Sequence, residues 1–258
     1  MYPTETAEER LLLDLDSVDL AAVLNRVARA ADDAGVSHSL VHLFDERAID
    51  RPAQARAIEG AVSSGRLSFA YLADFRAPGC RERVERAAAL GLRAVTFHPY
   101  LQRIESSEYA RVSEIALAAG ARGLIVAINA AYGSRMIYRV RPLELAVALL
   151  EAGAGPVVLL HGGGAKVLEA LLIAEAYPGV YLETSFSLSY WLGSRVEADF
   201  AFALSKLGPE RCLFGSDAPF CDRGAAVADH LRFFERHGFD ARAIERIMGG
   251  TAAGLLRL

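Results

Sequence analysis

The sequence predicts an α/β protein built as a (β/α)8 TIM barrel whose first strand is degenerate or shortened. Short apolar runs alternate with longer helical patterns, and the runs lack polar/apolar alternation, as expected of parallel strands covered on both faces. The length of 258 residues is close to that of such barrels, which is typically about 250 residues. Because no linker or shift in composition interrupts the pattern, we expect one domain over residues 1–258.

Seven apolar runs have the length and composition of buried strands. They are Ser39–Phe44, Leu67–Ala73, Leu92–His98, Gly123–Asn129, Pro156–His161, Gly179–Thr184 and Arg211–Ser216. An eighth candidate, "RLLLDLD" at Arg10–Asp16, is short and leads directly into a helical pattern. With it the barrel has eight strands, whereas an open doubly wound sheet of seven strands is the alternative.

Helical patterns separate these strands. Three of them, "SVDLAAVLNRVARAADDAG", "CRERVERAAALG" and "EYARVSEIALAAG", each end at a glycine, which commonly follows the last turn of a helix. The last patterns, "ARAIERIMGG" and "TAAGLLRL", are expected to close the barrel.

Composition and charge argue against several classes of protein. A net charge of −4 does not favour binding to nucleic acid or to an anionic membrane. Three scattered cysteines form neither a disulfide framework nor a C-x-x-C pair, which is typical of a reducing compartment. The polar, acidic N-terminus does not resemble a signal peptide, and no run approaches the ~20 apolar residues of a membrane span. We therefore expect a soluble cytoplasmic protein that acts on a small molecule, with a homodimer left open.

Polar side chains recur at the predicted carboxyl ends of the strands, where α/β barrels carry their chemistry. The candidates are His42, His98, Asn129, His161 and Asp217. Three of the six histidines lie at this rim, and this concentration is the main functional signal. The other histidines, at positions 38, 230 and 237, are interpreted as a strand start and helix surfaces without a role.

Each candidate also has a structural explanation. His161 precedes three glycines whose spacing matches neither nucleotide-binding motif, so it is either functional or part of a tight turn. Asp217, in "RCLFGSDAPF", is either a turn carboxylate or a general base or metal ligand. His98 precedes Pro99 and either contacts a ligand or packs, and Asn129 either binds substrate or caps a turn.

Arginines after the fourth and fifth strands are candidates for binding a substrate carboxylate. They are Arg103, Arg135 and Arg139. The alternative is that they are solvated surface residues. Near the second strand, His42 in "HSLVH" either contacts substrate or is simply buried.

Five segments resemble the amidohydrolase-related family of TIM-barrel hydrolases and decarboxylases. They are "GLRAVTFHPYLQ", "PVVLLHGGG", "YPGVYLETS", "ERCLFGSDAPF" and "IMGGTAAGLLRL", and the resemblance runs from about Gly35 to the C-terminus. It implies that His161 matches a histidine of acid–base catalysis, Asp217 the last-strand aspartate that joins the metal site, and His98 a substrate-facing histidine.

The sequence departs from this family at the metal site. The family's His-x-His pair is absent near the N-terminus, where Asp14-x-Asp16 stands instead, and the fifth-strand region "IVAINAA" has no histidine. Catalytic zinc normally needs about three protein ligands. We therefore expect no cofactor, and only Asp217, together with His161, is left as a candidate metal ligand. A rebuilt divalent-metal site drawn from His42, His98, His161 and Asp217 is the alternative.

These residues predict a hydrolase of a small carboxylate-bearing or cyclic ester substrate that works without the inherited metal. Asp217 is expected to act as general base, and His161 as acid/base or as oxyanion stabiliser. The expected substrate contacts are His42, His98, Asn129, Arg103 and Arg139. Two alternatives remain: a decarboxylase of a small hydroxylated carboxylic acid, and a non-catalytic binding protein derived from the family.

Overall fold

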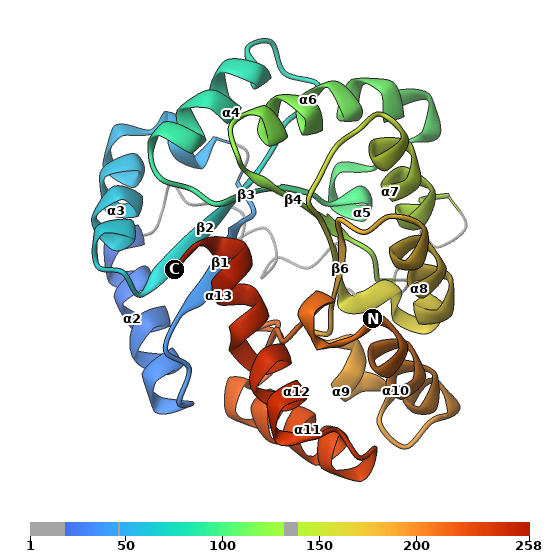
Figure 1. Ribbon diagram of the computed structural model, residues 1–258. Coiled ribbons are helices and arrows are strands. Elements are labelled where there is room, and N and C mark those ends of the chain that lie inside the picture. Colours follow the sequence, from blue (N-terminus) through green and yellow to red (C-terminus); the bar gives the residue numbers. More distant parts are fainter. Residues whose placement is uncertain (1–18, 46, 132–138) are drawn as a thin grey trace.

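One parallel β-sheet of seven strands forms the centre of the computed structural model, which describes residues 19–45, 47–131 and 139–258. The strands are β1 (Ser39–Leu43), β2 (Leu67–Leu72), β3 (Ala94–Phe97), β4 (Ile125–Asn129), β5 (Val157–Leu160), β6 (Val180–Glu183) and β7 (Cys212–Leu213). Each lies within one of the seven predicted runs. The strands pair in sequence order and curl into part of a barrel, with helices around the outside (Figure 1).

This sequential order contradicts the doubly wound alternative, because such sheets reverse their strand order at a switch point. The prediction of a TIM-barrel fold with a shortened first strand is confirmed. The candidate first strand, Arg10–Asp16, lies outside the described residues.

Helices follow the strands as predicted. They are α2 (Leu20–Asp33), α3 (Pro52–Ser63), α4 (Cys80–Ala89), α5 (Pro99–Gln102), α6 (Tyr109–Ala121), α7 (Pro142–Glu151), α8 (Val167–Ala176), α9 (Ser187–Trp191), α10 (Arg195–Leu207), α11 (Arg223–Arg236), α12 (Ala241–Glu245) and α13 (Thr251–Leu256). The glycine expected to end α6, Gly120, lies inside that helix, and Gly123 with φ 74° follows its end instead. No helix in the described ranges is both long and apolar enough to cross a bilayer.

The two faces of the sheet carry side chains of different size. Large residues such as Phe69, Tyr71 and Phe97 face the surrounding helices and belong to the main core. Small residues such as Ala70 and Ala127 face the interior of the barrel and belong to a second cluster. Alternation of this kind is what a strand requires when both of its faces are buried.

The C-terminal helix α13 packs at the end of the barrel where the strands begin. Leu256 belongs to the interior cluster together with Ala94 and Ile125, which lie at the starts of β3 and β4. The helix therefore covers the amino-terminal end of the interior. The carboxyl ends of the strands, where the polar residues gather, lie at the opposite end.

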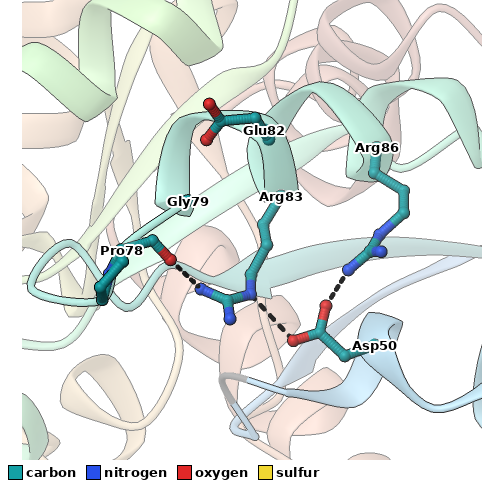
Figure 2. A pocket seen from close by; sticks show the side chains of 6 residues that line it. All are labelled: Asp50, Pro78, Gly79, Glu82, Arg83 and Arg86. Atoms are coloured by element: carbon teal, nitrogen blue, oxygen red, sulfur yellow. Dashed lines mark hydrogen bonds and ion pairs between the residues drawn. The ribbon is translucent and has the colours of Figure 1, made fainter.

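A surface hollow of about 340 Å³ lies beside the first turn of α4 (Figure 2). Its Arg83 and Arg86 both reach Asp50, and Nε of Arg83 lies 2.8 Å from Oδ2 of that carboxylate. Arg83 also donates to the carbonyl oxygen of Pro78 at 3.1 Å. Because these charges satisfy one another, we interpret the hollow as a structural link between the loop after β1 and the loop after β2.

Candidate active site

Five polar residues predicted from the sequence lie at the carboxyl-terminal rim of the barrel. His42 and Asn129 are in β1 and β4, His98 and His161 directly follow β3 and β5, and Asp217 lies four residues beyond β7. They lie around His161: Asn129 contacts its Nε2 at 2.9 Å, and His42, His98 and Asp217 are close enough to interact electrostatically with it. The structure thus brings the candidates together, while their catalytic roles remain predictions.

The side chain of His161 reaches this site because the backbone turns sharply at the end of β5. Leu160 faces the barrel interior, so the next residue of a regular strand would face the helices. His161 instead has φ 65°, a left-handed conformation that is uncommon outside glycine. The three glycines that follow also have positive φ, which allows the chain to turn into α8 within a few residues.

Hydrogen bonds fix the orientation of the His161 ring. Its Nδ1 lies 3.0 Å from the carbonyl oxygen of Ser185, which can only accept, so the partners assign the proton to Nδ1. Nε2 of the neutral ring then accepts from the Asn129 amide, whose Nδ2 lies 2.9 Å away. His161 is only 3% exposed and Asn129 only 2%, so this pair is shielded from solvent.

Glu183, the last residue of β6, anchors the same network. Its carboxylate accepts from the backbone N–H of His161 at 3.0 Å, and from the backbone N–H and hydroxyl of Ser185 at 2.7 and 2.8 Å. Gly215 makes this position accessible, because a Cβ atom there would overlap the Glu183 carboxyl group. The glycine of "FGSD" is therefore required because it lets the Glu183 carboxylate approach the backbone closely.

Asp217 is the carboxylate with the strongest sign of chemistry. Its Oδ2 is buried and has no hydrogen-bond donor among the described residues. Burial raises the pKa of Asp217 from its ordinary value of 3.8 to about 6, with the charge of Glu183 acting in the same direction and His161 opposing. The backbone of Asp217 has φ 58°, in the left-handed region, so it is strained as well.

Hydrogen bonds at Nδ1 orient the rings of His42 and His98. Nδ1 of His42 lies 2.8 Å from the hydroxyl of Thr96, and Nδ1 of His98 accepts from the backbone N–H of Leu101 at 3.1 Å. His98 therefore caps the short helix α5, which is the packing role left open by the sequence. Burial lowers the pKa of His42 to about 4 and that of His98 to about 3, and charge interaction with His161 adds to both effects.

An aromatic wall borders the site on the side of β6. The rings of Phe186 and His161 meet edge to face, with their centroids 6.2 Å apart. Phe186 also stacks on Tyr190, with the centroids 5.2 Å apart, and Tyr190 is 58% exposed. Phe186 has φ 54° and ψ −60°, and the N–H of Ser187 bonds the carbonyl of Ser185 across it. This is the rare, strained form of γ-turn.

Two buried polar residues of the site, Glu183 and Ser185, are not among the residues predicted from the sequence. The signal for them is the polar segment "LETS" at the end of a strand. His230 is not on a helix surface: it is fully buried and bonds Thr184 at 2.7 Å. Arg103 and Arg139 are exposed and show no contact with the rim histidines within the described residues, and Arg135 lies outside them.

The described residues do not fit the zinc site that the family pattern implies. Both ring nitrogens of His161 are occupied, by Ser185 and Asn129. Over the described ranges, no three histidine, cysteine, aspartate or glutamate side chains converge closely enough to hold a metal ion. The described residues therefore do not assemble the set of His42, His98, His161 and Asp217 around one ion, and that rebuilt site stays a prediction. Asp14 and Asp16 lie outside the described residues.

The lowered pKa values of His42 and His98 give a direct test of this geometry. His42 and His98 should stay neutral down to about pH 5, because burial disfavours their charged forms. Imidazole ¹⁵N NMR should show no titration of either ring above pH 5, whereas the urea-unfolded chain should titrate near 6.5. Since the unfolded chain binds these protons first, stability should fall as pH drops from 6.5 towards 4. A folded-state midpoint above 6 for either ring would contradict the burial.

Comparisons with known structures identify the same architecture. The chain is similar to a probable 2-pyrone-4,6-dicarboxylic acid hydrolase from Acinetobacter baumannii with citric acid bound (14% identity, TM-score 0.67, 91% of this chain and 89% of that chain). A protein from Pseudomonas putida provisionally given the same activity matches at 20% identity (TM-score 0.65, 91% and 87%). An uncharacterized TIM-barrel protein from Bordetella bronchiseptica matches at 18% identity (TM-score 0.70, 97% and 91%).

These identities are low enough that the structural matches establish the fold alone. No curated protein sequence matches the chain significantly. The sequence profile described as Amidohydrolase, however, matches residues 14–258, which is nearly the whole chain. It extends the resemblance from about Gly35 back to Asp14. The protein therefore belongs to the amidohydrolase family.

Proposed function

We propose that the protein hydrolyses a small cyclic ester, of the lactone type, by activating water with Asp217. The observation that carries this proposal is the buried Oδ2 of Asp217, which has no hydrogen-bond donor among the described residues. Burial also raises the pKa of this carboxyl to about 6, so that it is ionised yet appreciably basic near neutral pH. A general base works best with a pKa close to the operating pH.

The reaction follows from the position of Asp217. A water molecule transfers a proton to Oδ2 while its oxygen attacks the ester carbonyl carbon, which gives a tetrahedral intermediate. The ring C–O bond then breaks, and the departing alkoxide takes the proton back from Asp217. The product is a hydroxy acid, and the carboxylate is regenerated for the next cycle.

His161 assists this step from within its fixed network. With its proton on Nδ1, the neutral ring has no hydrogen to donate at Nε2. This favours a positioning role over direct hydrogen bonding to the oxyanion. His161 holds Asn129 in place through the hydrogen bond at Nε2.

The structural relatives support the ester class of substrate. Two of them carry names that describe hydrolysis of a 2-pyrone, which is a cyclic ester with two carboxylates. Esters also need less electrophilic assistance than amides, which suits a site where the described residues do not fit zinc. The expected contacts of Arg103 and Arg139 with a substrate carboxylate belong to this proposal, since both side chains are exposed on loops after the strands.

Replacing Asp217 separates its catalytic role from its effect on stability. Asp217→Asn should lower kcat/KM for lactone hydrolysis by about 10²–10⁴-fold, because the base is lost. The raised pKa means that ionisation of Asp217 destabilises the folded state, so the stability of wild type relative to the Asp217→Asn variant should fall as pH rises from 4 to above 6. At pH 7.5 the variant should be more stable by about 1–3 kcal/mol, with the difference vanishing near pH 4.

The exposed carboxylate Asp33, at the end of α2, provides the matched control. Asp33→Asn should change neither activity nor the pH dependence of stability. For wild type, kcat/KM should fall about tenfold per pH unit below pH 6. Wild-type activity of the Asp217→Asn variant, measured over a panel of lactones, would contradict the assignment of Asp217 as the general base.

Metal removal tests the other half of the proposal. Dialysis of active protein against a chelator should leave kcat/KM for lactones unchanged, because the described residues do not provide a zinc ligand set. Elemental analysis should find well below one zinc per chain. Stoichiometric zinc, with activity lost on chelation and restored by zinc, would show that the hydrolysis depends on a metal.

A further inference from the structure

Asn129 has a buried oxygen that the proposed reaction does not use. Its Oδ1 has no hydrogen-bond donor among the described residues, and the residue is 2% exposed. A buried acceptor without a donor is costly, and native structures rarely leave one without a reason. Asn129 lies at the end of β4, on the rim that also carries His161 and Asp217.

The direction of this oxygen is set by its neighbours. His161 accepts at Nε2, because its proton is placed on Nδ1 by the carbonyl of Ser185. The group of Asn129 that faces Nε2, at 2.9 Å, must therefore be the NH2 group. Rotating the amide by half a turn would set two acceptors against each other. The network thus holds Oδ1 on the side of the amide away from His161.

The surroundings of Oδ1 favour a neutral donor over a carboxylate. Asp217 and Glu183 bring negative charge to the site, and the described residues place no lysine or arginine against either of them or against Asn129. A ligand carboxylate next to Oδ1 would meet an acceptor and two carboxylates. A hydroxyl group would instead supply the missing hydrogen bond.

A substrate group can reach this oxygen because Asn129 and Asp217 both neighbour His161. Nδ2 of Asn129 lies 2.9 Å from Nε2 of His161, and His161 in turn lies close to Asp217. A ring whose ester lies beside Asp217 therefore has its substituents near Oδ1. A water molecule bound to Oδ1 is the alternative, and it would give no preference for a hydroxylated substrate.

We infer that Oδ1 of Asn129 accepts a hydrogen bond from a hydroxyl group of the substrate, which makes the substrate a hydroxylated cyclic ester. This rests on the proposed function for the ester, although the hydroxyl contact itself does not depend on turnover. Asn129 is then a specificity-determining residue whose other function is to hold His161.

The first experiment compares δ-valerolactone with its 3-, 4- and 5-hydroxy derivatives. In wild type, kcat/KM should be roughly 10- to 100-fold higher for at least one hydroxylated lactone than for the unsubstituted ring. Asn129→Leu should abolish this preference, because leucine has no acceptor. Asn129→Asp keeps an acceptor oxygen and should retain the preference, even where its overall rate is reduced by loss of the amide bond to His161.

Ser185→Ala is the control for an indirect effect. It removes the hydroxyl that contacts His161 and Glu183 but leaves Asn129 intact. It should slow hydrolysis of the hydroxylated and unsubstituted lactones by the same factor. If Asn129→Leu also acts equally on all substrates, or if wild type shows no preference, Asn129 serves only to position His161 and the inference fails.

A binding measurement separates this inference from the proposed reaction. Tetrahydropyran and its hydroxylated derivatives cannot be hydrolysed, and their binding can be followed by NMR through the side-chain NH2 signals of Asn129. Tighter binding of a hydroxylated ether to wild type, lost in Asn129→Leu, would uphold the inference even if no lactone is turned over. Lactone hydrolysis without any hydroxyl preference, in rates or in binding, would uphold the reaction and overturn the inference.

Discussion

The candidate site depends on the buried carboxylate of Glu183. This group accepts hydrogen bonds from the backbone of His161 and from both the backbone and the hydroxyl of Ser185. It therefore ties the end of β5 to the end of β6, at the point where the chain leaves both strands with positive φ values at His161 and Phe186. Hydrogen bonds to an ionised acceptor are stronger than neutral ones, so this carboxylate can hold a strained backbone in place.

The same group links structure to chemistry. By fixing Ser185, Glu183 places the carbonyl that assigns the proton of His161 to Nδ1, and the ring in turn orients Asn129. Its charge also adds to the effect of burial in raising the pKa of Asp217 to about 6. One carboxylate thus determines which atoms at the rim can donate, which can accept, and which can take up a proton.

The sequence was sufficient to predict the order and approximate bounds of the strands, because β2 and its neighbours are continuous apolar runs between clear helical patterns. It also indicated the rim residues His161 and Asp217, since parallel strands bring their carboxyl ends together. The network around Glu183 could not be predicted. It depends on a left-handed residue after β5 and on the space that Gly215 leaves, and neither follows from apolar periodicity.

Two further limits of sequence reasoning have physical causes. A metal site drawn from His42, His98, His161 and Asp217 stays a prediction, because the four share a rim but no three metal-ligating side chains of the described residues lie close enough to hold one ion. His230 looked like a helix-surface residue, yet its hydrogen bonds to Thr184 and to the carbonyl of Ala226 allow it to be fully buried. Burial of a polar group depends on partners that lie far away in the sequence.

The proposed reaction requires that the site holds Asp217 as a base with a raised pKa. Direct titration of its carboxyl carbon by ¹³C NMR, in the folded wild-type protein, tests this most closely. We expect a midpoint near pH 6, well above the value of about 3.9 for an unperturbed aspartate. A midpoint at or below 4 would show that the carboxylate is an ordinary solvated turn residue, and the proposed reaction would lose its base.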